Sequence, residues 1–367
     1  MSSVRRTLAS ERVLEVNAFG FLRLLLAGAV IVSNSWTLGG YGAEPLTRLR
    51  GGESLGFLAV TGFFGLSGAL VTLSAERLPS ANFLWHRARR ILPGYWACLL
   101  LTAFLFGAIL CWLDDLPLSA MTTPPQNSAR SFVINNFPLQ VNQYGVGYTL
   151  QKVPYDQALN GSLWSLPYEF FCYLIILGGV RSWQLAGRSR GLLLAFLAVS
   201  LACAVLVRDS EAKFLTWNLP LLGALDPRLF FFLWVVFLSG GILILLREHM
   251  PCSPLLVGLS IVLFCALLWL GLLQPYGGLL VPYVVLGLGR YAPAFLRRVG
   301  QRTDLSYGIY LYGFPLGQVL VASDRFHTPW TLALATLLLS LPAAALSWFG
   351  VERLFLAQRT GGAAVAT

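Results

Sequence analysis

Charged side chains are scarce in this sequence. Asp, Glu, Lys and Arg make up 11% of its 367 residues, whereas hydrophobic residues make up 56%, and the mean hydropathy is +0.69. Because a soluble protein carries about 25% charged residues, this composition excludes an ordinary water-soluble globular protein. We predict an all-α, polytopic membrane protein, since helices satisfy every backbone hydrogen bond within lipid.

Histidine and paired cysteines are also scarce. The chain has three histidines and six cysteines, and no cysteines show CxxC spacing. This pattern favours buried free thiols over a metal site or a disulfide framework, and no tightly bound cofactor is predicted. The net charge of +10 comes mostly from arginines in short loops. It therefore indicates membrane topology, and nucleic acid is not an expected partner.

Ten apolar segments are each long enough for a membrane-spanning helix. They lie near 19–38, 55–74, 91–112, 162–180, 191–208, 229–246, 254–273, 275–291, 305–322 and 329–350. With both termini in the cytoplasm, 17 of the 26 basic residues fall inside and 8 outside, which satisfies the positive-inside rule.

One transmembrane domain over 19–353 is predicted, between a cytoplasmic segment 1–18 and a cytoplasmic tail 354–367. The only long connection, near 113–161, is predicted to lie outside the membrane. A solvated loop is the default interpretation of this segment, and a lid or glycan-contacting loop is the alternative.

Two ionisable residues interrupt the predicted spans, Arg23 and Glu169. An intramembrane charge costs several kcal/mol unless it is paired or faces a watery cavity, so function is the first hypothesis and a structural ion pair the alternative. Asn34 follows Arg23 by eleven residues, so both project from nearly the same helix face, about 16 Å apart. The fourth span runs the opposite way and is predicted to bring Glu169 to the depth of Asn34, far from Arg23.

Three further motifs favour a polar interior. "FFGLSGAL" indicates close helix packing through its glycines, with Ser67 lining a cavity as the alternative. In "HRARRILPGYW", Arg87 and Arg90 are either a positive-inside anchor or a grip on a phosphorylated ligand. "DLSYGIYLYGFPL" places Tyr310 and Tyr312 along the ninth span, where they either pack or line a cavity.

These motifs occur in the order "FLRLLLAGAVIVSNSW", "FFGLSGAL", "RRILPGYW", "GSLWSLPYEFFCYL", "DLSYGIYLYGFPL" and "FGVERLF". This order resembles the acyltransferase-3 family of integral membrane acyltransferases over about residues 15–355. The resemblance implies transfer of an acyl group, commonly acetyl, from cytosolic acyl-CoA to a hydroxyl of an extracytoplasmic or lipid-linked glycan. The implied location is the bacterial inner membrane, and the implied partners are acyl-CoA, the glycan and membrane lipids.

The resemblance also implies residue roles. Arg23 matches the arginine of the family's Arg-x10-His motif, and Arg87 and Arg90 match its Arg-x-x-Arg pair, which is expected to contact the acyl-CoA. Ser67-Gly68 matches a Ser-Gly step, and Trp164 and Glu169 match a W-(S/T)-L-x-x-E element. The expected substrate-binding residues are Ser67, Trp164, Tyr168, Tyr310 and Tyr312.

The chain departs from the family at Asn34, which occupies the position of the motif histidine. An imidazole there would be a general base or a transient acyl carrier, whereas a carboxamide can only form hydrogen bonds. The three histidines, His86, His249 and His327, are predicted in or beside loops away from Asn34.

Arg23, Asn34 and Glu169 are therefore the expected catalytic residues, with Glu169 as the base. Three explanations of Asn34 remain open: an introduced substitution, a natural member with impaired chemistry, or a modified mechanism that uses Glu169. The alternative functions are a non-catalytic family member and a secondary transporter or flippase of lipid-linked sugars.

Overall fold

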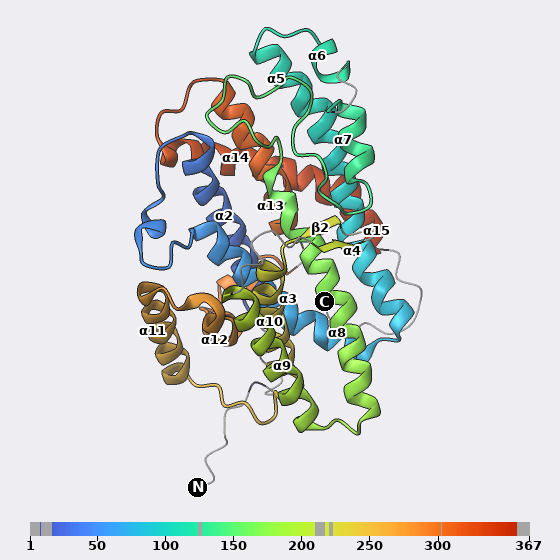
Figure 1. The fold of residues 1–367 in the computed structure, drawn as a ribbon, viewed down its shortest axis with the longest axis vertical. Coiled ribbons are helices and arrows are strands. Elements are labelled where there is room, and N and C mark those ends of the chain that lie inside the picture. Colours follow the sequence, from blue (N-terminus) through green and yellow to red (C-terminus); the bar gives the residue numbers. More distant parts are fainter. Residues whose placement is uncertain are drawn as a thin grey trace.

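Each of the ten predicted apolar segments forms a helix in the computed structural model (Figure 1). The structure describes Leu8 and residues 17–123, 127–209, 217–219, 223–301 and 303–357. The long helices are α2 (Phe19–Leu38), α3 (Leu55–Arg77), α4 (Ser80–Leu100), α8 (Ser165–Leu185), α9 (Arg190–Asp209), α10 (Pro227–Leu245), α11 (Pro254–Leu270), α12 (Leu273–Tyr291), α13 (Ser306–Ala322) and α14 (Pro329–Ser347).

Seven helical stretches of the described chain are long and apolar enough to cross a bilayer. They are Phe19–Leu38, Leu55–Arg77, Ser80–Leu113, Gly161–Leu185, Arg190–Arg208, Pro227–Leu245 and Pro329–Leu356. Helix α11 is apolar but shorter, with 17 residues. The all-α, polytopic membrane fold is thus confirmed, while the count of ten spans and their orientation stay predictions.

Three helices begin at the same local signal, a capping residue followed by proline. Asp226, Ser253 and Thr328 each accept a backbone hydrogen bond from the first turn of α10, α11 and α14. The proline that follows has no N–H to satisfy and its φ is already helical. These dipeptides therefore fix where the three helices start.

The third predicted span begins earlier than the sequence suggested. Helix α4 starts at Ser80, so Arg87 and Arg90 lie within the helix and not ahead of it. The helical stretch continues through the π-helical turn Leu101–Phe106 into α5 (Gly107–Leu113). The prediction was set by hydropathy alone, which misses the amphipathic first half of a helix whose arginines begin seven residues after its start.

The long connection predicted near 113–161 is partly folded. It contains α6 (Ser119–Thr122), α7 (Ala129–Asn136) and a 3-10 turn at Gly161–Trp164. Its residues return to α4, where the Tyr95 hydroxyl donates to the Asn136 carbonyl over 2.6 Å. Part of this connection is therefore folded and packs against α4.

The remaining elements are short. β1 (Trp217–Leu219) and β2 (Gly223–Leu225) pair antiparallel with Trp217 opposite Leu225, which the sequence did not predict. Four further helical turns are described: Pro45–Arg48, Leu296–Arg298, Trp348–Glu352 and α15 (Arg353–Ala357). The turn Trp348–Glu352 is π-helical and connects α14 to α15.

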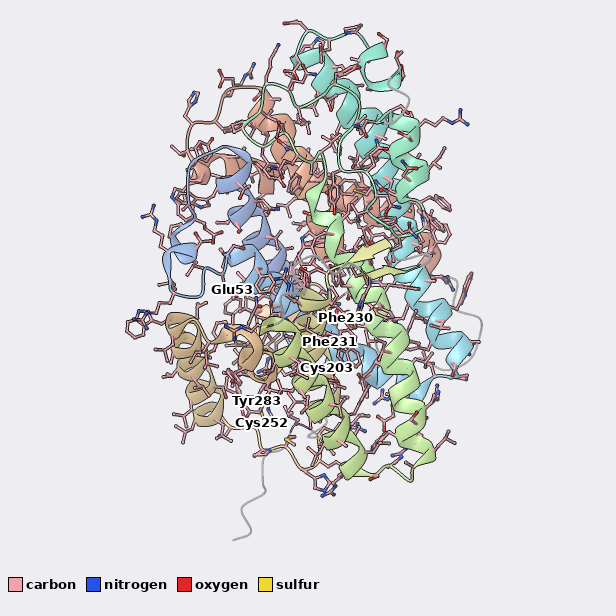
Figure 2. All side chains as sticks on the ribbon, viewed as in Figure 1. Glu53, Cys203, Phe230, Phe231, Cys252 and Tyr283 are labelled. Atoms are coloured by element: carbon pink, nitrogen blue, oxygen red, sulfur yellow. The ribbon has the colours of Figure 1, made fainter. Side chains whose placement is uncertain are left out.

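The connections gather at two ends of the bundle. One end is here called the Glu76 end, because Glu76 pairs there with Arg247 at 3.1 Å and with Arg188 at 3.7 Å. These ion pairs bring together the α3–α4, α8–α9 and α10–α11 connections. At the other, the Glu53 end, Gln274 donates to Glu53 over 2.9 Å. Figure 2 shows Glu53 and Cys252 at opposite ends of α11 and α12. The positive-inside count predicts a cytoplasmic Glu76 end.

Helices α3 and α10 cross closely in the core. A Cβ added at Gly68 would collide with the Phe237 backbone, and one at Gly240 would meet the carbonyl of Gly65. The predicted close packing of "FFGLSGAL" is confirmed, because only glycine allows the two backbones to approach this far. The neighbouring Ser67 faces the other way, towards a cavity.

Candidate active site

A cavity of about 130 Å³ lies among α2, α3, α4, α8 and α13. Its polar lining side chains are Arg23, Ser67, Arg87, Arg90, Ser165, Glu169, Tyr173, Ser306, Tyr307 and Tyr310, and the rest of the lining is apolar. Six of the ten predicted site residues meet here: Arg23, Ser67, Arg87, Arg90, Glu169 and Tyr310. Segments far apart in the sequence thus supply one polar site inside an apolar bundle.

Two of the arginines share one carboxylate. Asp304 Oδ2 lies 3.2 Å from Arg23 Nη1 and 2.6 Å from Arg90 Nη2. Arg90 Nη1 also lies 3.6 Å from Glu352 Oε2, whose side chain is 2% exposed. The predicted alternative of an Arg23–Glu169 ion pair is therefore wrong: Arg23 is paired, but its partner is Asp304.

Asp304 is held in place by the residue that starts α13. Its Oδ1 accepts from the Ser306 hydroxyl over 2.6 Å and from the Ser306 backbone N–H over 3.2 Å. Burial alone raises the pKa of this carboxyl, which lies before α13, but the charges of Arg23 and Arg90 and the bonds from Ser306 lower it to about 2. Asp304 is therefore ionised and fixes both guanidinium groups.

A second set of polar contacts joins α3 to α8 across the cavity. Glu169 Oε1 accepts from the Ser67 hydroxyl over 2.8 Å and from the Tyr173 hydroxyl over 2.7 Å. Arg87 of α4 lines the same cavity as Tyr173. Among the described residues, no hydrogen bond reaches Glu169 Oε2. The protein thus positions one oxygen of this carboxylate through two hydrogen bonds.

The Glu53 side of the cavity ends at Tyr310. Its hydroxyl donates to the Ser162 carbonyl over 2.7 Å and lies 2.6 Å from the Ser165 hydroxyl. Phe63 packs edge-on against the same ring, with 6.1 Å between the ring centroids. Tyr310 therefore joins the start of α8 to α13 and forms part of the cavity wall on this side.

Comparison with known proteins identifies the family of this chain. Residues 16–349 match the acyltransferase-3 family, described as an acyltransferase domain. The chain belongs to the acyltransferase-3 family. It is also 31% identical over 353 residues to an "O-acetyl transferase" of Shigella phage Sf6, covering 93% of this chain and 96% of the relative. No solved structure matches the chain. The protein is therefore an acyltransferase embedded in the membrane.

Asn34 of this acyltransferase lies apart from the cavity. It is half-buried near the Glu53 end of α2 and is not among the residues that line the cavity. Its neighbour Ser33 donates to Glu44 Oε2 over 2.6 Å. The prediction that put Glu169 near Asn34 and far from Arg23 is therefore wrong, because Arg23 and Glu169 line one cavity and Asn34 does not.

Three other predicted residues also lie elsewhere. Trp164 and Tyr168 line a separate pocket beside the start of α8. Tyr312 is buried and lies 3.5 Å from the Ser347 hydroxyl, which donates to Glu352 Oε1 over 2.9 Å. Their assignment to the substrate site stays a prediction.

The histidines of this acyltransferase do not replace the motif histidine. His86, predicted in or beside a loop, is an exposed residue inside α4. His249 lies 2.6 Å from Arg190 at the Glu76 end. His327 lies in the connection between α13 and α14. Glu169 therefore remains the proton acceptor predicted for the cavity.

Sequence reasoning missed Asp304, Glu352 and Tyr173. Asp304 and Glu352 belong to quoted motifs, but both fall at the ends of predicted spans and read as solvated charges. Tyr173 follows Glu169 by four residues, a spacing that places two side chains on one helix face. That spacing was the signal that could have found it.

Proposed function

We propose that this acyltransferase transfers an acetyl group from acetyl-CoA to a hydroxyl of an extracytoplasmic or lipid-linked glycan, in the inner membrane of a bacterium. The name of the phage relative, O-acetyl transferase, supports the group and the acceptor atom. The observation that carries the proposal is the single cavity in which three arginines meet Glu169.

Arg87 and Arg90 are the proposed contacts of the acetyl-CoA. Arg87 is seven residues from the start of α4, which places it about 10 Å from the Glu76 end. Its buried Nε has no partner among the described residues. Guanidinium groups bind phosphate through paired N–H donors. A phosphate-bearing donor entering from the Glu76 end would therefore meet Arg87 before its thioester reaches Glu169.

Glu169 is the proposed general base. The acceptor hydroxyl would attack the thioester carbonyl carbon while its proton passes to Glu169 Oε2. Collapse of the tetrahedral intermediate breaks the C–S bond, and the proton moves from Glu169 to the departing thiolate, which gives an acetyl ester and free CoA. Ser67 and Tyr173 hold the other carboxylate oxygen, so the base keeps its orientation through the cycle.

Asn34 is proposed to make this chain slower than an otherwise identical chain with histidine. An amide accepts no proton, so one base that the family motif supplies is absent. Asn34 lies on the same helix as Arg23, eleven residues nearer to the Glu53 end, along the path proposed for the acceptor.

The test uses the full-length protein in nanodiscs with labelled acetyl-CoA and a panel of methyl hexopyranosides. We expect CoA release with transfer of label to the sugar, and a rate at least about tenfold higher for Asn34→His, since a positioned base contributes about 10²–10⁴-fold. Absence of transfer from both proteins would refute the O-acetyltransferase proposal. Equal transfer by both would refute the impairment and leave Glu169 as the sufficient base.

A further inference from the structure

A second cavity, of about 240 Å³, opens beside the first turn of α8. Its walls come from the long connection after α5, the start of α8, β2 and the start of α10. Three aromatic side chains line it: Tyr144, Trp164 and Tyr168. Because α8 starts and α10 starts at the Glu53 end, this pocket lies at the end of the bundle opposite to Glu76.

The aromatic side chains leave hydrogen-bond donors available to a ligand. Tyr168 accepts from the Asp226 backbone N–H over 2.8 Å, and its own O–H has no acceptor among the described residues. Neither the Trp164 indole N–H nor the Tyr144 hydroxyl has a hydrogen-bond partner in that part of the chain, and Tyr144 is 41% exposed. The pocket thus combines ring faces with three polar groups whose N–H or O–H donates to none of the described residues.

The geometry points to a binding site for one pyranose ring of the acceptor glycan, an inference that rests on the proposed O-acetyltransferase function. A pyranose has C–H groups on one face, which stack on aromatic rings, and a rim of hydroxyls, which bind N–H and O–H groups. Trp164 and Tyr168 lie with ring centroids 5.8 Å apart at an interplanar angle of 75°. They offer a face and an edge to the same ligand. A purely apolar ligand would leave the donors unsatisfied.

The position of the pocket fits an acceptor. Trp164 and Tyr168 flank Ser165, and Ser165 and Glu169 line the central cavity. Consecutive helix residues are about 100° apart, so the two cavities lie on adjacent sides of the same helical turn. A saccharide held at Trp164 would therefore have its next residue close to the proposed base.

The test measures binding of methyl α-D-glucopyranoside by saturation-transfer NMR on the nanodisc protein, with sorbitol as a matched polyol that lacks a pyranose face. We expect transfer to the pyranoside C–H protons and not to sorbitol. Trp164→Leu should reduce it at least about fivefold, because Trp and Tyr dominate such contacts. Trp112→Leu, which changes a tryptophan that is 76% exposed and outside the pocket, should leave it unchanged.

Tyr144→Ala is the second variant, because a half-exposed side chain can be removed without emptying a core. Equal signals from the wild type and both pocket variants, or from the pyranoside and sorbitol, would overturn the pyranose site. The same samples report CoA release from acetyl-CoA. If pyranoside binding depends on Trp164 but no acetyl transfer is detected, the proposed function is refuted and the pyranose site is retained. If acetyl transfer is detected and the KM for the sugar is unchanged in both variants, the pyranose site is refuted and the proposed function is retained.

Discussion

Replacing Glu169 by glutamine removes the proposed base and little else. The amide oxygen of the new side chain can still accept from Ser67 and Tyr173, as Glu169 Oε1 does over 2.8 and 2.7 Å. The amide NH₂ then occupies the place of Oε2 and cannot take up a proton. General-base catalysis contributes about 10²–10⁴-fold, which corresponds to about 3–5 kcal/mol of transition-state stabilisation. We expect kcat for acetyl transfer to fall by this factor, with the KM for acetyl-CoA changed less than about threefold.

The assay is CoA release in nanodiscs at saturating acetyl-CoA and acceptor. Glu53→Gln is the matched control, since it makes the same chemical change at a half-buried carboxylate that accepts from Gln274 outside the cavity. Its expected activity is that of the wild type. A Glu169→Gln protein with wild-type kcat and the wild-type unfolding temperature would refute the assignment of Glu169 as base.

Three further substitutions test other parts of the cavity and core. Arg87→Ala should weaken acetyl-CoA binding about 10- to 100-fold by calorimetry, because a charged hydrogen bond is lost. The control is Arg89→Ala, which changes an arginine outside the cavity lining and should leave the affinity unchanged. Equal affinities of the two variants would contradict the phosphate contact. Asp304→Asn should destabilise the protein by about 3 kcal/mol, because Arg23 loses its ion pair and Arg90 loses one of its two ion pairs. An unchanged unfolding midpoint would show that these ion pairs do not stabilise the fold. Gly68→Ala should lower the free energy of unfolding by about 1–3 kcal/mol, because the new Cβ collides with the Phe237 backbone. Gly28→Ala is the control and should not lower the unfolding midpoint, since its Cβ meets nothing within 4 Å. A lower midpoint for Gly28→Ala than for Gly68→Ala would refute the close α3–α10 packing.

The helices could be predicted because hydropathy and length are local properties. The glycines of "FFGLSGAL" likewise predicted close packing, and Gly68 meets the α10 backbone. Hydropathy failed at Ser80, where α4 begins with polar residues that it reads as a loop. It also gave no sign of the pairing between Trp217 and Leu225, since a hairpin of two short strands has almost no periodicity to detect.

Family resemblance named five residues that line the cavity, and the tyrosines of "DLSYGIYLYGFPL" added Tyr310. The depth argument kept Arg23 from pairing with Glu169, but it wrongly placed the two far apart, because both line one cavity. It could not show that Asp304 reaches both Arg23 and Arg90, because lateral distances depend on how helices pack. For the same reason the sequence placed Asn34 near Glu169, whereas Asn34 does not line the cavity.

The π-helical turn after α14 has a practical consequence for where this protein can be shortened. The match to the family ends at residue 349, yet Glu352, three residues further, is buried beside Arg90 and bonded to Ser347. A protein trimmed to the family boundary would keep all its long helices and still lose one of the two carboxylates that neutralise Arg90. Truncations, fusions and tags at this terminus therefore belong beyond Glu352, and we expect closer trimming to disturb the cavity through Arg90.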